Sequence, residues 1–333
     1  MANSSLVYSN ARVKAMENSL LSLEKITRMM YAETLEDGIK VLYESNYGGT
    51  TLTNANDYET LLKNEETKLS NFLIEAMPKN SGLEIFIAKL DYQNAKALCK
   101  AKYLKLDDAQ FMMASQGFLN INTLKEAIFT DSYGNLPAPM QTALKEIDNN
   151  FITGDKSAKF VDVQLDRAMF KELLSLVKRA KAKSIKKYVV ASIDFANIGS
   201  FLRCKRIGAE VKYFKSMFIE GGELDLYDYD AVYDQNVDAF AEKFRFSFYG
   251  KMLGQAVEEM KKTNSLVNFE TMQDDFLLDL FKDDRHDVFS IAPIAGYFIA
   301  KKTEQKVIRM ILVCLKNKVD KQLIKQRLRE IYA

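Results

Sequence analysis

Residue types that carry enzymatic chemistry are few in this chain, and their spacing fits no catalytic arrangement. The single histidine, His286, lies in an Asp-Asp-Arg-His-Asp stretch and could act as a general base, but a base needs a nucleophile placed beside it. Gly154 opens a Gly-Asp-Lys-Ser stretch that lacks the adjacent Gly-Lys pair of a phosphate-binding loop. Neither a His-x-x-x-His motif nor paired cysteines give metal-ligand spacing. We therefore expect a solvated loop at His286 and no catalytic, cofactor-binding or metal-binding residues.

An acidic stretch between Glu223 and Asp238 raises the question of calcium binding. A calcium loop beginning at Asp225 would need glycine at its sixth position and glutamate at its twelfth. Those positions hold Asp230 and Asn236, so we interpret the stretch as a solvated acidic face. The interleaved apolar residues indicate that one side of it packs inward: Tyr227, Tyr229, Val232 and Tyr233.

A basic stretch at residues 178–187 has six cations in ten residues and no interleaved aromatic residue: Lys178, Arg179, Lys181, Lys183, Lys186 and Lys187. Such a cluster could contact nucleic acid, an acidic protein surface or anionic lipid. The other interpretation is an ordinary helix end, where cations are favourable beside the negative end of the helix dipole. The first interpretation underlies our alternative function, a helical scaffold or nucleic-acid-associated protein.

The bulk composition describes a globular protein. With 333 residues, 47% of them hydrophobic, the chain can bury a sizeable core, and its formal net charge of +2 is unlike that of a dedicated nucleic-acid-binding protein. The three cysteines are widely spaced, as is typical of reduced thiols packed in the core of a cytosolic protein. The best candidate for a membrane span, residues 288–300, is interrupted by Pro293 and Gly296 and is shorter than the ~20 residues that cross a bilayer.

Apolar residues recur at helical spacing along nearly the whole chain, which contains only four prolines. Asn10 and Asp166 are candidate N-caps. Because apolar–polar alternation is nowhere sustained, we predict an all-α fold. Helices are predicted over residues 13–30, 58–77, 83–105, 166–177 and 320–333.

One pattern occurs three times at intervals of about one hundred residues, longer than the roughly 20–50 residues of most repeat arrays. In each copy an apolar run ends on a carboxylate, which is Asp91, Asp194 or Glu304. Asparagine follows three residues later in the first two copies, whereas the third copy has Val307. The pattern predicts three quasi-equivalent helical subdomains, at residues 1–110, 111–215 and 216–333.

Cations also recur at matched distances after the repeated acids. Lys100 and Arg203 follow the acid by nine residues, and Lys102 and Lys205 follow it by eleven. Ordinary solubility would explain them, but quasi-equivalent helices could instead present them toward a shared axis. We therefore take five residues as candidates for a polar central cavity or a partner interface: Lys100, Lys102, Arg203, Lys205 and Arg309.

In order and spacing, the segments of this chain resemble the C subunit of the V-type (A/V-type) ATPases of bacteria and archaea, the counterpart of the d subunit in eukaryotic V-ATPases. The resemblance rests on Asn10 to Glu17, Tyr47-Gly48-Gly49, Asp91 to Leu98, Asp194 to Ile198, Leu202 to Lys205, Tyr297 to Lys301, Glu304, Val307 to Leu312, and Leu328 to Tyr332. The third core departs from the family pattern, because Pro293 stands alone where two prolines are common. Lys302 and Val307 stand where the family often has an acid and an asparagine.

This resemblance implies an all-helical, pseudo-threefold funnel. In the family, the funnel sits on the proteolipid ring of the membrane sector and receives the end of the central shaft, which is made of the D and F subunits. It turns with the rotor, couples ATP hydrolysis or synthesis to proton or sodium transport, and catalyses nothing itself. The resemblance thus implies a peripheral protein on the cytoplasmic face of the membrane, with the membrane stator as a further contact. It implies no cofactor, no nucleic acid and no small-molecule substrate.

Overall fold

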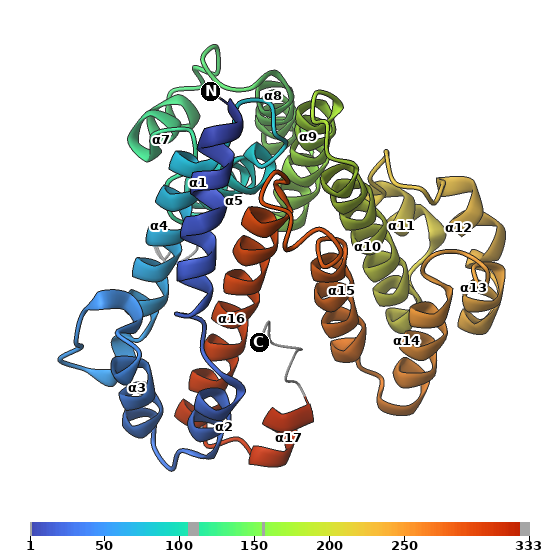
Figure 1. The fold of residues 1–333 in the computed structure, drawn as a ribbon. Coiled ribbons are helices and arrows are strands. Elements are labelled where there is room, and N and C mark those ends of the chain that lie inside the picture. The colour runs from blue at the N-terminus through green and yellow to red at the C-terminus, as the bar shows by residue number, and fades with distance from the viewer. Residues whose placement is uncertain (1, 106–112, 155–156, 327–333) are drawn as a thin grey trace. The chain divides into compact units, whose positions relative to one another are not determined.

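The computed structural model describes residues 2–105, 113–154 and 157–326. Every regular element in these ranges is a helix, so the predicted all-α class is confirmed (Figure 1). None of the described helices is both long and apolar enough to cross a membrane. Residues 328–332 of the predicted last helix lie outside the described residues, as do Asp155 and Lys156.

The chain forms two compact units. We call them the first unit, Met1–Pro78 with Glu258–Ala333, and the second unit, Lys79–Val257. One helix, α14 (Gly250–Thr263), runs from the second unit into the first. The predicted boundaries of three subdomains and their threefold symmetry stay predictions.

The first unit is organised around one long C-terminal helix, α16 (Ala292–Lys316). Its other elements are α1 (Ala2–Glu17), α2 (Leu23–Tyr31), α3 (Leu35–Glu44), η1 (Tyr47–Gly49), η2 (Ala55–Asp57), α4 (Glu59–Ala76), α15 (Val267–Asp279) and α17 (Lys321–Gln326). All of the α-helices in this list contact α16, with the blue N-terminal helices beside the red C-terminal one in Figure 1. Ile26 and Leu42 share a buried cluster with Val307 and Ile311. The two ends of the sequence therefore form one core.

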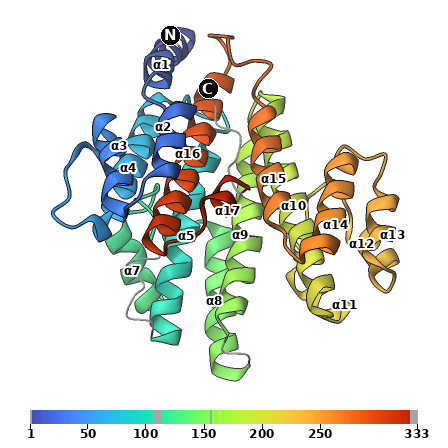
Figure 2. The same cartoon turned by 90° about the horizontal axis from the view of Figure 1, so that it is seen from below.

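The second unit is organised around α9 (Ala158–Lys178), which packs against three other helices. They are α5 (Glu84–Leu104), α8 (Ala138–Thr153), seen beside α9 in Figure 2, and α10 (Lys183–Ile207). Shorter helices complete the unit: α7 (Ile121–Phe129), α11 (Val211–Met217), α12 (Leu226–Tyr233) and α13 (Val237–Lys243). Helix α10 is capped at its C-terminus by Gly208, whose φ of +64° is the left-handed conformation that ends many helices.

Two predicted helix starts were wrong. Asn10 lies inside α1, and its amide donates to the carbonyls of Val288 (2.7 Å) and Ser290 (2.9 Å). Asp166 lies inside α9, which begins earlier because Ser157 accepts a hydrogen bond from the amide of Phe160 (3.2 Å). The helix expected over residues 13–30 is two helices, and Ser22 is the N-cap of the second. Apolar periodicity continues across such breaks, so it does not locate a cap.

Other local predictions are confirmed. Helix α4 ends at Ala76, just before Pro78, where the residue preceding proline is driven out of helical conformation. All three cysteines are buried thiols: Cys99, Cys204 and Cys314. In the acidic stretch, Tyr229 and Tyr233 are buried as expected, but Tyr227 is 79% exposed. The inward side of that stretch is therefore narrower than predicted.

Candidate functional site: the repeated acids and their cations

The first repeated acid fastens a loop to helix α5. Asp91 is buried, and its carboxylate accepts hydrogen bonds from the backbone amides of Phe118 and Leu119, both at 3.0 Å. One turn later, the side chain of Asn94 accepts from the amide of Ala114 (2.8 Å) and donates to the carbonyl of Ser115 (3.1 Å). The acid and the asparagine together satisfy four backbone groups of residues 114–119, which would otherwise be buried without partners.

The second repeated acid does the same on helix α10. Asp194 accepts from the amides of Glu223 and Leu224 at 3.0 Å and from the hydroxyl of Tyr249 at 2.7 Å. Asn197 donates to the carbonyl of Ile219 (2.8 Å) and accepts from its amide (2.9 Å). The repeat seen in the sequence is thus a repeat of hydrogen-bond geometry: a buried acid and an asparagine one turn apart hold a loop.

Glycine in each clamped loop is a part of the repeat that sequence reasoning missed. A Cβ atom on Gly117 would lie 2.2 Å from Asp91 Oδ1, and one on Gly222 would lie 2.2 Å from Asp194 Oδ1. Only glycine lets the backbone come this close to the carboxylate. The sequence did carry the signal for the first two copies, since Gly117 and Gly222 follow Asp91 and Asp194 at similar distances, whereas no glycine follows Glu304.

The third acid clamps a segment from the opposite end of the chain. Glu304 of α16 accepts from the amide of Leu21 at 2.6 Å, and Leu21 connects α1 to α2. Val307, where the other copies have asparagine, is buried in the apolar core instead. The third clamp therefore closes through tertiary contact with the N-terminal segment rather than through the residues that follow its acid.

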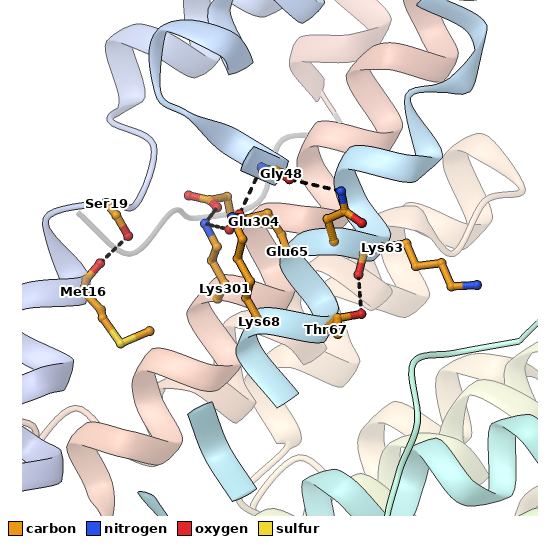
Figure 3. Close-up of polar contacts among 10 residues, drawn as sticks. Met16, Ser19, Gly48, Lys63, Glu65, Thr67, Lys68, Lys301 and Glu304 are labelled. Carbon is orange, nitrogen blue, oxygen red and sulfur yellow. Dashed lines mark hydrogen bonds and ion pairs between the residues drawn. The ribbon is translucent and has the colours of Figure 1, made fainter. Parts of the chain in front are cut away.

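A buried lysine distinguishes this third clamp (Figure 3). Lys301 is 3% exposed and lies 2.5 Å from Glu304 and 3.3 Å from Glu65 of α4. Burial raises the pKa of Glu304, and the nearby ammonium of Lys301 offsets part of that rise. At Glu65, burial also acts to raise the pKa, but the hydrogen bond from Lys68 and the charge of Lys301 leave it lowered. The cluster borders a pocket of about 250 Å³, which Tyr47 and Tyr297 also line.

Burial gives Asp91 a pKa of about 6, and the two backbone amides that it accepts from limit the rise. This pKa lies above the ordinary 3.8, so the protonated side chain of Asp91 is favoured in the folded protein. The contribution of Asp91 to the free energy of unfolding is therefore fully present below about pH 4 and is lost as pH rises through 6. We expect the unfolding free energy of the wild type minus that of Asp91→Asn to fall by about 2 kcal/mol between pH 4 and pH 7. Denaturant unfolding at several pH values measures this difference, and a flat difference would contradict it.

Two of the five candidate cations donate hydrogen bonds to backbone carbonyls at the C-terminal ends of helices. Lys102 donates to the carbonyl of Ile128 (2.8 Å) near the end of α7 and pairs with Asp131. Lys205 donates to the carbonyls of Tyr233 (2.6 Å) and Gln235 (2.7 Å) at the end of α12. Each satisfies carbonyls that a helix leaves without partners at its C-terminus. These two lysines, which occupy matched positions in the sequence, therefore make the same kind of contact with a helix C-terminus.

The other three candidates differ in exposure. Lys100 pairs with Asp162 of α9 at 2.7 Å, and its side chain is only 18% exposed. Arg309 forms a two-pronged pair with Glu59 (2.9 and 3.0 Å) with its side chain 49% exposed, and Arg203 is exposed. Lys100 and Arg309 thus already contact acids of their own unit. A role of any of the five in a cavity or at a partner surface stays a prediction. His286 is exposed, as expected of a loop residue.

The chain is thus an all-helical protein in which three long helices, α5, α10 and α16, each fasten a loop or connecting segment through a buried acid. Residues 9–327 match the family described as "ATP synthase (C/AC39) subunit". The chain belongs to that family, which confirms the resemblance found in the sequence.

Curated relatives align over nearly their whole length. The C subunit of a V-type sodium ATPase from Enterococcus hirae is 21% identical, covering 97% of this chain and 98% of the relative. The C subunit of an A-type ATP synthase from Thermococcus kodakarensis is 23% identical, covering 97% and 90%. Its counterpart from Halorubrum lacusprofundi is 27% identical, covering 91% of each chain.

Proposed function

We propose that this protein is the non-catalytic C subunit of a rotary A/V-type ATPase, the socket that joins the central shaft to the proteolipid ring. The observation that carries the proposal is the family match over residues 9–327, together with relatives of similar length that are named as C subunits. The protein would turn with the rotor and transmit torque between the ATP-driven head and the ion-carrying membrane sector. Ion choice, proton or sodium, would be made in other subunits.

The clamped helices suit a part that transmits torque. Such a part must be stiff, and close-packed helices are stiff because protein interiors have little free volume. The carboxylates of Asp91, Asp194 and Glu304 tie loops to the long helices with charge-assisted hydrogen bonds, which are stronger than neutral ones. We propose that the three helices that carry these acids, α5, α10 and α16, are quasi-equivalent parts of the wall of a pseudo-threefold funnel. This funnel would lie at the cytoplasmic face of the membrane.

The partners that we propose are the proteolipid ring, the D and F subunits of the shaft, and the membrane stator. Affinity purification of the tagged chain from detergent-solubilised membranes tests this set. We expect the ring and both shaft proteins to be recovered. Recovery of neither would contradict the proposal. Recovery of nucleic acid instead, with binding that weakens steeply as salt rises, would favour the alternative of a nucleic-acid-associated scaffold.

Charge reversal tests the proposed interface cations. Arg203→Glu with Arg309→Glu changes the two candidates whose cationic groups are most exposed. Loss of the half-exposed Arg309–Glu59 pair costs the fold only about 0–1 kcal/mol, and substitution of the exposed Arg203 is also expected to cost little, so the variant should stay folded. We expect assembly with ring or shaft to weaken at least tenfold, measured by the fraction recovered in the same purification. Unchanged assembly would show that these two arginines do not contribute to the interface.

A further inference from the structure

The corner between α9 and α10 carries six cations that the proposed function does not use. All six are exposed: Lys178, Arg179, Lys181, Lys183, Lys186 and Lys187. Within the described part of the chain, none of these side chains has an ion-pair or hydrogen-bond partner. The sequence has no acid between Glu172 and Asp194. Because the whole chain has a net charge of only +2, the remainder has more acidic than basic residues.

Helix ends explain only part of this cluster. Lys178 and Arg179 close α9, where cations are favourable. Lys183, Lys186 and Lys187 lie at the opposite pole of a helix dipole, in the first turns of α10. That helix has no acid in its first turn and no side-chain hydrogen bond from its N-cap. Positive charge is unfavourable there, so stability does not account for these three lysines.

The corner is packed, so the charges project from a fixed surface. Val177, Ala180 and Ile185 are buried, and the amide of Ala180 donates to the carbonyl of Val177 at 3.1 Å. Gly82, with φ of +92°, passes so close that a Cβ atom there would lie 2.8 Å from Ile185 Cγ2 and 2.9 Å from the Cβ of Ala180. The apolar residues fix the backbone, and the cations point outward.

We propose that this basic corner, residues 178–187, binds the headgroup surface of an anionic phospholipid bilayer. Five of the six cations are lysines, which act as point charges without the fixed fork that suits specific two-pronged recognition. The stretch has no aromatic residue on which a base could stack, which disfavours single-stranded nucleic acid. The proposal rests on the proposed function only for the nearness of a membrane. It adds an electrostatic contact with lipid to the protein contacts proposed above.

Vesicle sedimentation with the full chain tests the proposal. The vesicles contain phosphatidylcholine alone or mixed with phosphatidylglycerol. Each cation near an anionic surface strengthens partitioning by about fivefold. We expect the wild type to sediment with the mixed vesicles and not with vesicles of phosphatidylcholine alone. High salt should release the protein from the mixed vesicles, because salt screens the electrostatic contact. A Lys181→Gln, Lys183→Gln, Lys186→Gln, Lys187→Gln variant should bind at least tenfold more weakly.

A second variant separates binding from folding. In Lys183→Glu with Lys186→Glu, acids replace cations at the start of α10, where negative charge is favourable. We expect an unchanged or higher thermal midpoint together with lost vesicle binding. A matched control changes four exposed lysines elsewhere to glutamine and should bind vesicles like the wild type: Lys63, Lys79, Lys145 and Lys212.

Three results would overturn the proposal. They are equal binding by the wild type and the four-lysine corner variant, equal binding to both kinds of vesicle, and binding of duplex DNA through the corner lysines with no vesicle binding. The last result would make the corner a nucleic-acid site. Because the vesicles contain no protein, failure here leaves the socket function standing. Failure to recover the ring and shaft proteins would likewise leave this lipid contact standing.

Discussion

Replacing Lys301 by methionine is expected to lower the free energy of unfolding by about 3–5 kcal/mol, because the change leaves the buried carboxylate of Glu304 without its cation. It also removes one of the two lysines beside Glu65, which keeps its pair with Lys68. Lys301 is 3% exposed between Glu304 and Glu65, whose side chains are 1% and 12% exposed. Methionine keeps the apolar stem, so the loss reports the missing charge rather than a cavity. Denaturant unfolding at neutral pH measures it.

The loss should depend on pH in a definite direction. Without the ammonium, the pKa of Glu304 rises further above its ordinary value than burial already takes it. A raised folded-state pKa gives stability that is present at low pH and lost as pH rises, so the penalty of Lys301→Met should shrink as pH falls toward about 4. As a control, Lys306→Met removes a pair with Asp274 in which the lysine side chain is 50% exposed, and it should cost about 0–1 kcal/mol. Equal costs for the two variants would contradict the buried cluster.

Replacing Asp194 by alanine is expected to destabilise the protein by about 3–5 kcal/mol, because each buried polar group left without a partner costs about 1–3 kcal/mol. The groups are the amides of Glu223 and Leu224 and the hydroxyl of Tyr249. Asp194→Asn keeps an acceptor and should cost less. The unfolding free energy measures the total, and hydrogen exchange of the two amides localises it.

The matched control for Asp194 is Asp225→Ala in the same loop region. Asp225 is exposed, and its side chain makes no capping hydrogen bond to α12. It should cost less than about 0.5 kcal/mol, as surface substitutions usually do. If Asp225→Ala costs as much as Asp194→Ala, or if the amides of Glu223 and Leu224 exchange no faster in the Asp194 variant, the clamp is not what holds this loop.

The sequence predicted the helical class and the repeated acids because both follow from local patterns. Asp91 with Asn94 and Asp194 with Asn197 stand at one fixed spacing, and apolar periodicity marks the long helices around them. What the acids bind was not predictable, because Leu21 and Glu304 meet only in the tertiary structure. The burial of Lys301 was missed, although the same position three residues before the acid is held in the other two copies by Ala88 and Ala191, which are buried.

The candidate cations show the same limit. Their matched spacing in the sequence did not separate a cation that binds its own chain from one that is free to bind a partner. Lys102 and Lys205 satisfy helix-end carbonyls, which depends on where α7 and α12 end. In the basic stretch, Lys178 and Arg179 lie at a helix C-terminus, whereas Lys183, Lys186 and Lys187 lie at a helix N-terminus. Whether a cation in this stretch lies at the end of α9 or at the start of α10 depends on where the two helices meet, which the charge pattern does not show.

The most direct test of the coupling role uses a reconstituted complex prepared with and without this protein. ATP hydrolysis and ATP-driven ion uptake into vesicles are measured on the same preparation. We expect the complex lacking the protein to keep ATP hydrolysis and to lose ion uptake, with uptake restored when the protein is added back. Ion uptake that continues without the protein, or hydrolysis by the detached head that requires it, would contradict a passive coupler between shaft and ring.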